Sequence, residues 1–252
     1  MTSDPFSRLR TFTAARIGLG RAGVSLPTQR VLEFQMAHAQ ARDAIHAAFD
    51  AEAIAAGLAG LSPVIVESRA IDRRVYLERP DEGRRLSDSS RMKLRGQFDG
   101  VVVLADGLSA RAAQAHGAEL VRAVLAATPG WNWGPPVIAR LARVALGDEI
   151  AQALDARLVV MLIGERPGLS SPDSLGAYLT FVPQPGVTTD SARNCVSNIR
   201  PQGLPIAEAA RKIVAIAALA RRLQLTGVAC KEDEAMALAG ASPAGVIEGT
   251  VH

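Results

Sequence analysis

Two charged turns follow the most apolar segments of the sequence, and their side chains could contact a ligand. Asp106 and Ser109 follow residues 100–105, and Glu165 follows residues 157–163 between two glycines. In open parallel sheets, ligands bind where the carboxyl ends of the strands meet. For Asp106 and Ser109 we favour helix capping, since both side chains accept hydrogen bonds from the amides of a first helical turn. For Glu165 we favour ligand binding, because a carboxylate beside glycines can accept hydrogen bonds from a closely approaching molecule.

A glycine-rich segment near the start of the chain matches the pattern G-x-G-x-x-G of dinucleotide-binding proteins. It spans residues 18–23, and Asp43 follows 20 residues after the last glycine. In that motif a strand precedes the glycines and a helix begins within them, so that helix amides hold the pyrophosphate. Here residues 24–27 follow without a helical pattern, and Asp43 falls inside an expected helix. The segment therefore does not indicate a dinucleotide site.

The histidines do not indicate a metal site. His38 and His46 are eight residues apart on one face of an expected helix, but no third ligand accompanies them. We interpret both as ordinary helical side chains, and His116 as a surface residue of a later helix. No G-x-S-x-G, H-E-x-x-H or P-loop pattern occurs. The residues alone therefore assign no catalytic group and no metal ligand.

The cysteines and a pair of arginines carry weaker signals. Cys195 has no His or Lys close in sequence to lower its pKa, so its chemistry favours a small buried hydrophobic side chain. Cys195 and Cys230 have no zinc-ligand spacing and cannot form a disulfide framework. Arg84 and Arg85 could bind a phosphate or cap a helix, and the sequence does not separate these alternatives.

The composition is that of a globular protein and excludes several classes of function. Of 252 residues, 48% are hydrophobic and 21% are charged, which excludes disorder and collagen-like repeats. Aromatic residues are scarce at 4%, and 28 basic groups nearly balance 25 acidic ones, so we expect no nucleic-acid partner. No apolar segment is long enough to span a membrane, and the chain does not begin like a signal peptide. We expect a soluble intracellular protein.

Beyond residue 63, short apolar segments alternate with helical patterns. This alternation predicts βαβ units, a mostly parallel sheet of five or six strands and a three-layer α/β fold. The polar segment 188–199 predicts no element. Expected strands cover residues 64–66, 100–105, 136–141, 157–163 and 175–182, and expected helices cover residues 110–127, 147–156 and 205–225.

We divide the chain after residue 62, where a proline ends a helical region. Residues 1–62 form a small helical N-terminal region, helical from Pro27 to about Leu61, and residues 63–252 form the α/β domain. From about residue 228 the chain is rich in alanine and glycine, and we expect a mobile or loosely docked tail.

Five segments, in this order along the chain, carry a resemblance to a known family. They are residues 20–23 (GRAG), 76–86 (YLERPDEGRRL), 105–109 (ADGLS), 164–169 (GERPGL) and 194–199 (NCVSNI). Together they resemble the small subunit (light chain) of ethanolamine ammonia-lyase. The resemblance extends from about Leu9 to Gly227 and does not cover the tail.

The resemblance implies a Rossmann-like α/β fold with flanking helices after a helical N-terminal region. It also implies adenosylcobalamin, held between this chain and a larger, barrel-shaped subunit in a hetero-oligomer with several copies of each chain. The family converts ethanolamine to acetaldehyde and ammonia by radical chemistry that belongs to the cofactor. The resemblance implies a cytoplasmic location, which could be inside a bacterial microcompartment. The sequence lacks the long N-terminal extension that some members carry for that compartment.

The resemblance also implies three cofactor contacts. Val144, Glu165 and Cys195 match positions that contact cobalamin in the family. Corrin side chains end in amides, whose N–H groups a carboxylate such as Glu165 can accept. For Cys195 the implied role is a small polarizable contact, not a nucleophile. Substrate-binding residues of the family lie on the large subunit, so we expect no catalytic residue here.

Two alternatives remain beside the subunit interpretation. A self-sufficient nucleotide-using α/β enzyme would bind a dinucleotide without a partner. A cobalamin-binding regulatory module would bind cobalamin as an isolated chain, whereas a subunit would bind it weakly until its partner arrives. A subunit should also expose an apolar surface when alone, because part of its interface is then uncovered.

Overall fold

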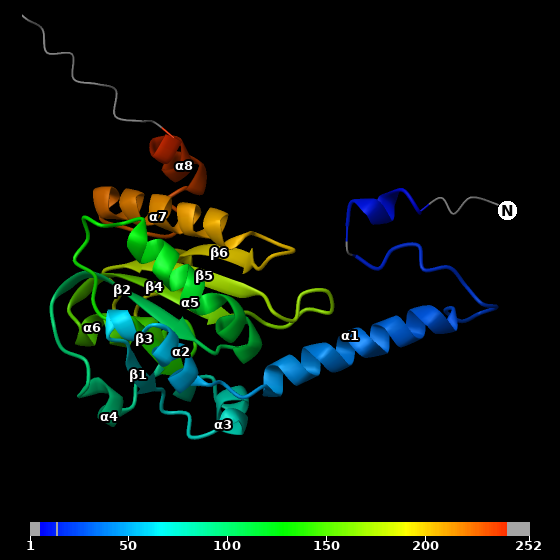
Figure 1. The fold of residues 1–252 in the computed structure, drawn as a ribbon, viewed down its shortest axis with the longest axis horizontal. Helices are drawn as coiled ribbons and strands as arrows, with labels where there is room; N and C mark the ends of the chain where they lie inside the picture. The colour runs from blue at the N-terminus through cyan, green and yellow to red at the C-terminus, as the bar shows by residue number, and fades with distance from the viewer. Residues whose placement is uncertain (1–5, 14, 241–252) are drawn as a thin grey trace, which may run out of the picture.

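A computed structural model describes residues 6–13 and 15–240 and shows an α/β fold built on one six-stranded sheet (Figure 1). The strand order is β1-β3-β2-β4-β5-β6; the pairs among the first four strands are parallel, and β4–β5 and β5–β6 are antiparallel. The strands are β1 (Val64–Glu67), β2 (Phe98–Ala105), β3 (Val137–Arg140), β4 (Ala156–Gly164), β5 (Leu175–Phe181) and β6 (Asn194–Ile199). The mostly parallel α/β sheet that the sequence predicts is therefore confirmed.

Eight α-helices are described along with short 3-10 turns. They are α1 (Thr28–His46), α2 (Ala51–Gly57), α3 (Arg73–Glu78), α4 (Asp88–Arg91), α5 (Ala110–Ala126), α6 (Leu146–Ala153), α7 (Ile206–Leu223) and α8 (Glu232–Gly240). The 3-10 turns are η1 (Leu9–Thr11), η2 (Ala59–Leu61), η3 (Glu82–Arg84) and η4 (Asp190–Ala192). The helical stretch expected from Pro27 to Leu61 is divided into α1 and α2. Asp50 accepts a hydrogen bond from Ala53 N at 2.8 Å and thereby caps the start of α2.

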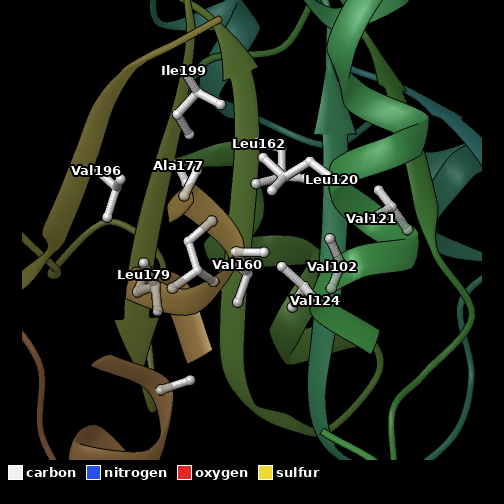
Figure 2. Packing of buried hydrophobic residues seen from close by; sticks show 14 of the residues in the cluster. Val102, Leu120, Val121, Val124, Val160, Leu162, Ala177, Leu179, Val196 and Ile199 are labelled. Atoms are coloured by element: carbon white, nitrogen blue, oxygen red, sulfur yellow. The ribbon is translucent and has the colours of Figure 1, made fainter. Parts of the chain in front are cut away.

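The central strands are apolar on both faces because each face carries its own core. Val102 and Leu104 of β2 point into a core formed with α2, α5 and α7, whereas Val101 and Val103 point into a core formed with α6. Figure 2 shows the first core, with side chains of α5 beside those of β2 and β4, and the core continuing across β5 to β6. Truncating a buried leucine or isoleucine of these cores to alanine costs about 2–5 kcal/mol.

The second face of the sheet is covered only in part. Helix α6 packs on β4 and β2, and in the described chain it makes no comparable contact with β5 or β6. Thr180 of β5 is buried under Arg193, which pairs with Asp148 of α6, but the other side chains of β5 and β6 on this side lie beyond α6. We call this region the open face and define it by Gly176 and Tyr178 of β5 and Cys195 of β6.

Helix α1 and the residues before it extend away from the α/β body (Figure 1). We call residues 6–13 and 15–46 the N-terminal arm. In α1 only Ala37, Ala41 and Ala44 are buried. Large apolar side chains of the arm are exposed instead, namely Phe6, Leu9, Phe12, Val24, Leu26, Leu32, Phe34 and Met36. The arm is thus an apolar surface that the rest of the chain does not cover.

The tail differs from the expectation over its first part. Cys230 and Ala235 are each 1% exposed in the first core, and α8 packs against α7 (Figure 1). Residues 228–240 are therefore docked on the α/β body and not mobile, and the rest of the expected tail, residues 241–252, lies outside the described residues. A sixth strand, β6, occupies residues 194–199, for which the sequence predicted no element.

Candidate functional site

Glu165 lies at the carboxyl end of β4, where it borders the open face. Its Oε2 accepts hydrogen bonds from Ser174 Oγ and from Asn198 N, the latter at 3.1 Å. A Cβ atom at position 176 would lie 2.9 Å from Glu165 Oε1, so glycine at this position lets the carboxylate lie close against β5. Oε1 accepts no hydrogen bond from the described residues. Glu165 is therefore held by one oxygen while the other can accept from an approaching donor.

Tyr178 and Cys195 lie side by side on the open face. They are paired across the β5–β6 ladder, and the Tyr178 hydroxyl and the Cys195 thiol are hydrogen-bonded. Cys195 is exposed, so the burial expected for it is wrong: β6 is an edge strand and its outward face carries no helix. Partial burial of the sulfur raises the pKa of the Cys195 thiol, and the charge of Glu165 adds to this rise. The thiol is thus protonated near neutral pH and is not a nucleophile.

Val144 lies in the loop between β3 and α6. Its side chain is partly buried and packs against the second core, as does Tyr178. Val144 also lines a cavity of about 680 Å³ that extends to Arg193, two residues before Cys195. Of the three predicted contacts, Glu165 and Cys195 are brought together around Tyr178, and Val144 borders the adjoining cavity.

A buried ion pair joins α6 to the base of β6. Arg193 Nη1 and Nη2 each donate to one carboxylate oxygen of Asp148 at 2.7 Å, and Nη1 also donates to Thr180 Oγ1 at 2.8 Å. The side chains are 3% and 1% exposed. The pair fixes α6, which follows Val144, relative to β5 and β6. Sequence reasoning missed it, because residues 148 and 193 are far apart in the chain and match no motif.

The turn after β2 uses its two polar residues differently from expectation. Ser109 caps α5, accepting from Ala112 N at 3.3 Å, and it donates to Pro172 O at 2.8 Å. The capping role expected for Asp106 is wrong. Asp106 instead accepts hydrogen bonds from Leu141 N and Ala142 N at 3.0 and 3.1 Å. Burial raises the pKa of Asp106 to about 6. It holds the loop that leads to Val144.

The remaining candidates do not form a site. In the glycine-rich segment 18–23, no strand precedes the glycines, a bridge between Ala22 and Ser25 closes a turn, and α1 begins only at Thr28, so the described residues lack the strand and helix that a dinucleotide motif requires. His116 is buried, 3.8 Å from Asp173 Oδ2, and its expected surface position is wrong. Among the described residues, no group of three His, Cys, Asp or Glu could hold a metal ion. None of the described helices is both long and apolar enough to span a bilayer.

Comparison with known proteins gives one consistent family. Residues 3–231 match the family model described as ethanolamine ammonia-lyase light chain. An ethanolamine ammonia-lyase small subunit from Xanthomonas campestris pv. campestris is 50% identical, with 96% of this chain and 92% of that protein covered. Small subunits of the same name from Azotobacter vinelandii and Ralstonia nicotianae are 48% and 49% identical. They cover 98% and 92% of this chain, and 97% and 90% of their own length.

Proposed function

Because the chain belongs to the ethanolamine ammonia-lyase light-chain family, we propose that it binds one side of adenosylcobalamin while a large, barrel-shaped subunit binds the other. The complex converts ethanolamine to acetaldehyde and ammonia. The observation that carries this proposal is the open face of the sheet, where Glu165 and Cys195 lie beside Tyr178 with no helix above them.

The residues of the open face fit the chemistry of a corrin ring. The ring is broad and flat, and its rim carries amide groups. Gly176 adds no side chain to the face, Cys195 adds only a small thiol, and Tyr178 offers an apolar ring. Glu165 Oε1 has free lone pairs that can accept from an amide N–H. An apolar floor with one carboxylate at its edge matches such a ligand.

The role of this chain is to hold and orient the cofactor. When bound, adenosylcobalamin supplies the radical by homolysis of its cobalt–carbon bond. Glu165 accepts a hydrogen bond from a corrin amide, and Val144 and Cys195 contact the rim and keep water away from it. The raised pKa of Cys195 keeps its thiol protonated, which suits a packing contact. We assign no catalytic residue to this chain and place the substrate contacts on the large subunit.

The N-terminal arm supports the proposed partner. Its exposed apolar residues include Val24, Phe12 and Met36, at 102%, 77% and 63% exposure. Apolar surface of this extent marks an interface in a protein that works as a subunit. We propose that the arm packs against the large subunit, and that the complex works in the cytoplasm or inside a bacterial microcompartment.

Ammonia release from ethanolamine tests the proposal. The large subunit is assayed with adenosylcobalamin, with and without this chain. Activity that requires both chains is expected, because the open face supplies one side of the cofactor site. Equal activity of the large subunit alone would refute the proposal. Tight cobalamin binding by the isolated chain would favour a regulatory cobalamin sensor instead.

A further inference from the structure

Four arginines line the cavity that borders Val144: Arg193, which is paired with Asp148, and three that form no ion pair with a described carboxylate. Arg84 and Arg85 lie at the end of η3, and Arg143 immediately precedes Val144. We call this the arginine cavity; its volume is about 680 Å³. It adjoins the proposed cofactor site, since Val144 and Arg193 belong to its wall.

The carboxylates of the arginine cavity are already paired with other cations. Asp81 accepts from Arg79 at 2.9 Å and Glu149 accepts from Arg91 at 2.7 Å. Asp148 and Asp190, the other two carboxylates of the cavity, both pair with Arg193, the latter at 3.7 Å from its Nε. The Arg79 guanidinium, and more weakly the charge of Arg84, lower the pKa of Asp81. These acidic groups therefore do not neutralise the other three arginines of the cavity.

In contrast, the guanidinium groups of Arg84, Arg85 and Arg143 form no ion pair with a described carboxylate. Within the described part of the chain, neither Arg84 nor Arg85 forms an ion pair or a side-chain hydrogen bond. Arg143 donates to a carbonyl, Tyr76 O at 2.9 Å, and its Nε is buried without a hydrogen-bond partner. A cavity with three such cations favours an anion.

Arg143 is held in place before any ligand binds. Its guanidinium lies 4.2 Å from the centre of the Tyr76 ring, and its backbone N donates to Gly83 O at 2.8 Å. A Cβ atom at position 83 would lie 2.9 Å from Arg143 Cγ, so the approach of these two segments requires glycine. The glycine thus brings Arg84 and Arg143 to one cavity.

We propose that the arginine cavity binds the phosphodiester of the nucleotide loop of the cobalamin. This inference rests on the proposed function, because it places part of the same cofactor. The phosphodiester is the negative charge of that loop, and guanidinium groups form paired hydrogen bonds with phosphate oxygens. The cavity lies next to Val144, a proposed corrin contact, so the loop can reach it from the open face. The phosphate alternative for Arg84 and Arg85 is thereby preferred over helix capping.

The test compares two corrinoids in the complex of both subunits. Cyanocobalamin contains the phosphodiester and cyanocobinamide lacks it, and the dissociation constant of each is measured by spectrophotometric titration. For the double variant R84Q/R85Q we expect an affinity for cyanocobalamin about tenfold lower or more, and a change below about twofold for cyanocobinamide. Both arginines are exposed, so the variant should fold.

The control is R95Q/R111Q, which removes two exposed arginines outside the cavity and gives the same net charge. It should leave both affinities unchanged. Equal weakening of both corrinoids by R84Q/R85Q, or no weakening of either, would overturn the inference. Loss of subunit association in sedimentation velocity would also overturn it and would assign the arginines to the partner interface. A wild-type complex that binds no cyanocobalamin would refute the proposed function itself.

Discussion

The buried pair of Asp148 and Arg193 gives the sharpest prediction about the architecture of the site. Two N–O distances of 2.7 Å and almost complete burial make it an ion pair shielded from water. Replacing Asp148 by Asn keeps the shape of the side chain but removes the only buried counter-charge of Arg193, which is left with the exposed Asp190 at 3.7 Å from its Nε. Breaking one partner of such a pair costs about 3–5 kcal/mol. We therefore expect D148N to lower the free energy of unfolding by about that amount.

Urea unfolding of the isolated chain measures this loss. Trp131 and Trp133 are stacked with ring centres 5.2 Å apart and pack against the first core, so their fluorescence reports on unfolding. The control D88N breaks an exposed pair of Asp88 with Arg69, which is expected to contribute little. In the double variant D148N/R193M no charge is left buried, and we expect it to regain much of the stability that D148N loses. A D148N variant no less stable than D88N would refute the reasoning.

Three further predictions concern the open face and the N-terminal arm. E165Q keeps the size of the side chain but removes its charge, and it should weaken cobalamin retention by the complex in equilibrium dialysis. The control E119Q, on the exposed side of α5, should leave cobalamin retention unchanged. Because its pKa is raised, Cys195 should react slowly with iodoacetamide at pH 8 and faster as the pH rises above 9. A rate at pH 8 equal to that of a free model thiol would contradict this, as measured by mass spectrometry. L32K/M36K should leave the circular dichroism of the isolated chain unchanged but abolish co-purification with the large subunit, and unchanged co-purification would remove the arm from the interface.

The central part of the fold could be predicted because its signals are local. The apolar segments that became β2 and β4 are buried on both faces, and such strands are continuous in sequence. Ser109 begins α5 as a capping residue should. Asp106, three residues earlier, also has a side-chain oxygen that could cap a helix, but its partners include amides of the loop after β3. No local pattern could reveal those partners.

Strand β6 escaped prediction because its surroundings are unusual. Of its six residues only Val196 and Ile199 are buried, since one face packs on the first core and the other belongs to the open face. An edge strand of this kind carries polar residues without regular alternation. The same cause explains the wrong expectation for Cys195. Its residue type is usually buried, but its strand has one uncovered face.

The three predicted contacts came from the family resemblance, because residue chemistry alone did not select them. Glu165 was favoured from its place after a strand, but Val144 is an ordinary apolar residue and Cys195 has no activating neighbour in sequence. What the structure adds is Tyr178, Arg193 and Asp148, which surround or support those positions. These residues could not be found from spacing, since their partners lie on other elements.

The open face follows from the connectivity of the sheet. Parallel strands need crossover connections, and the helices of those connections cover both faces of the sheet. Strands β4, β5 and β6 are instead joined as antiparallel neighbours, so no crossover helix lies on the α6 side of β5 and β6. Gly176 and Cys195 keep this region flat. A sheet face of this kind is accessible to another molecule. The antiparallel extension of the sheet is therefore the feature of the fold that makes the proposed shared cofactor site possible.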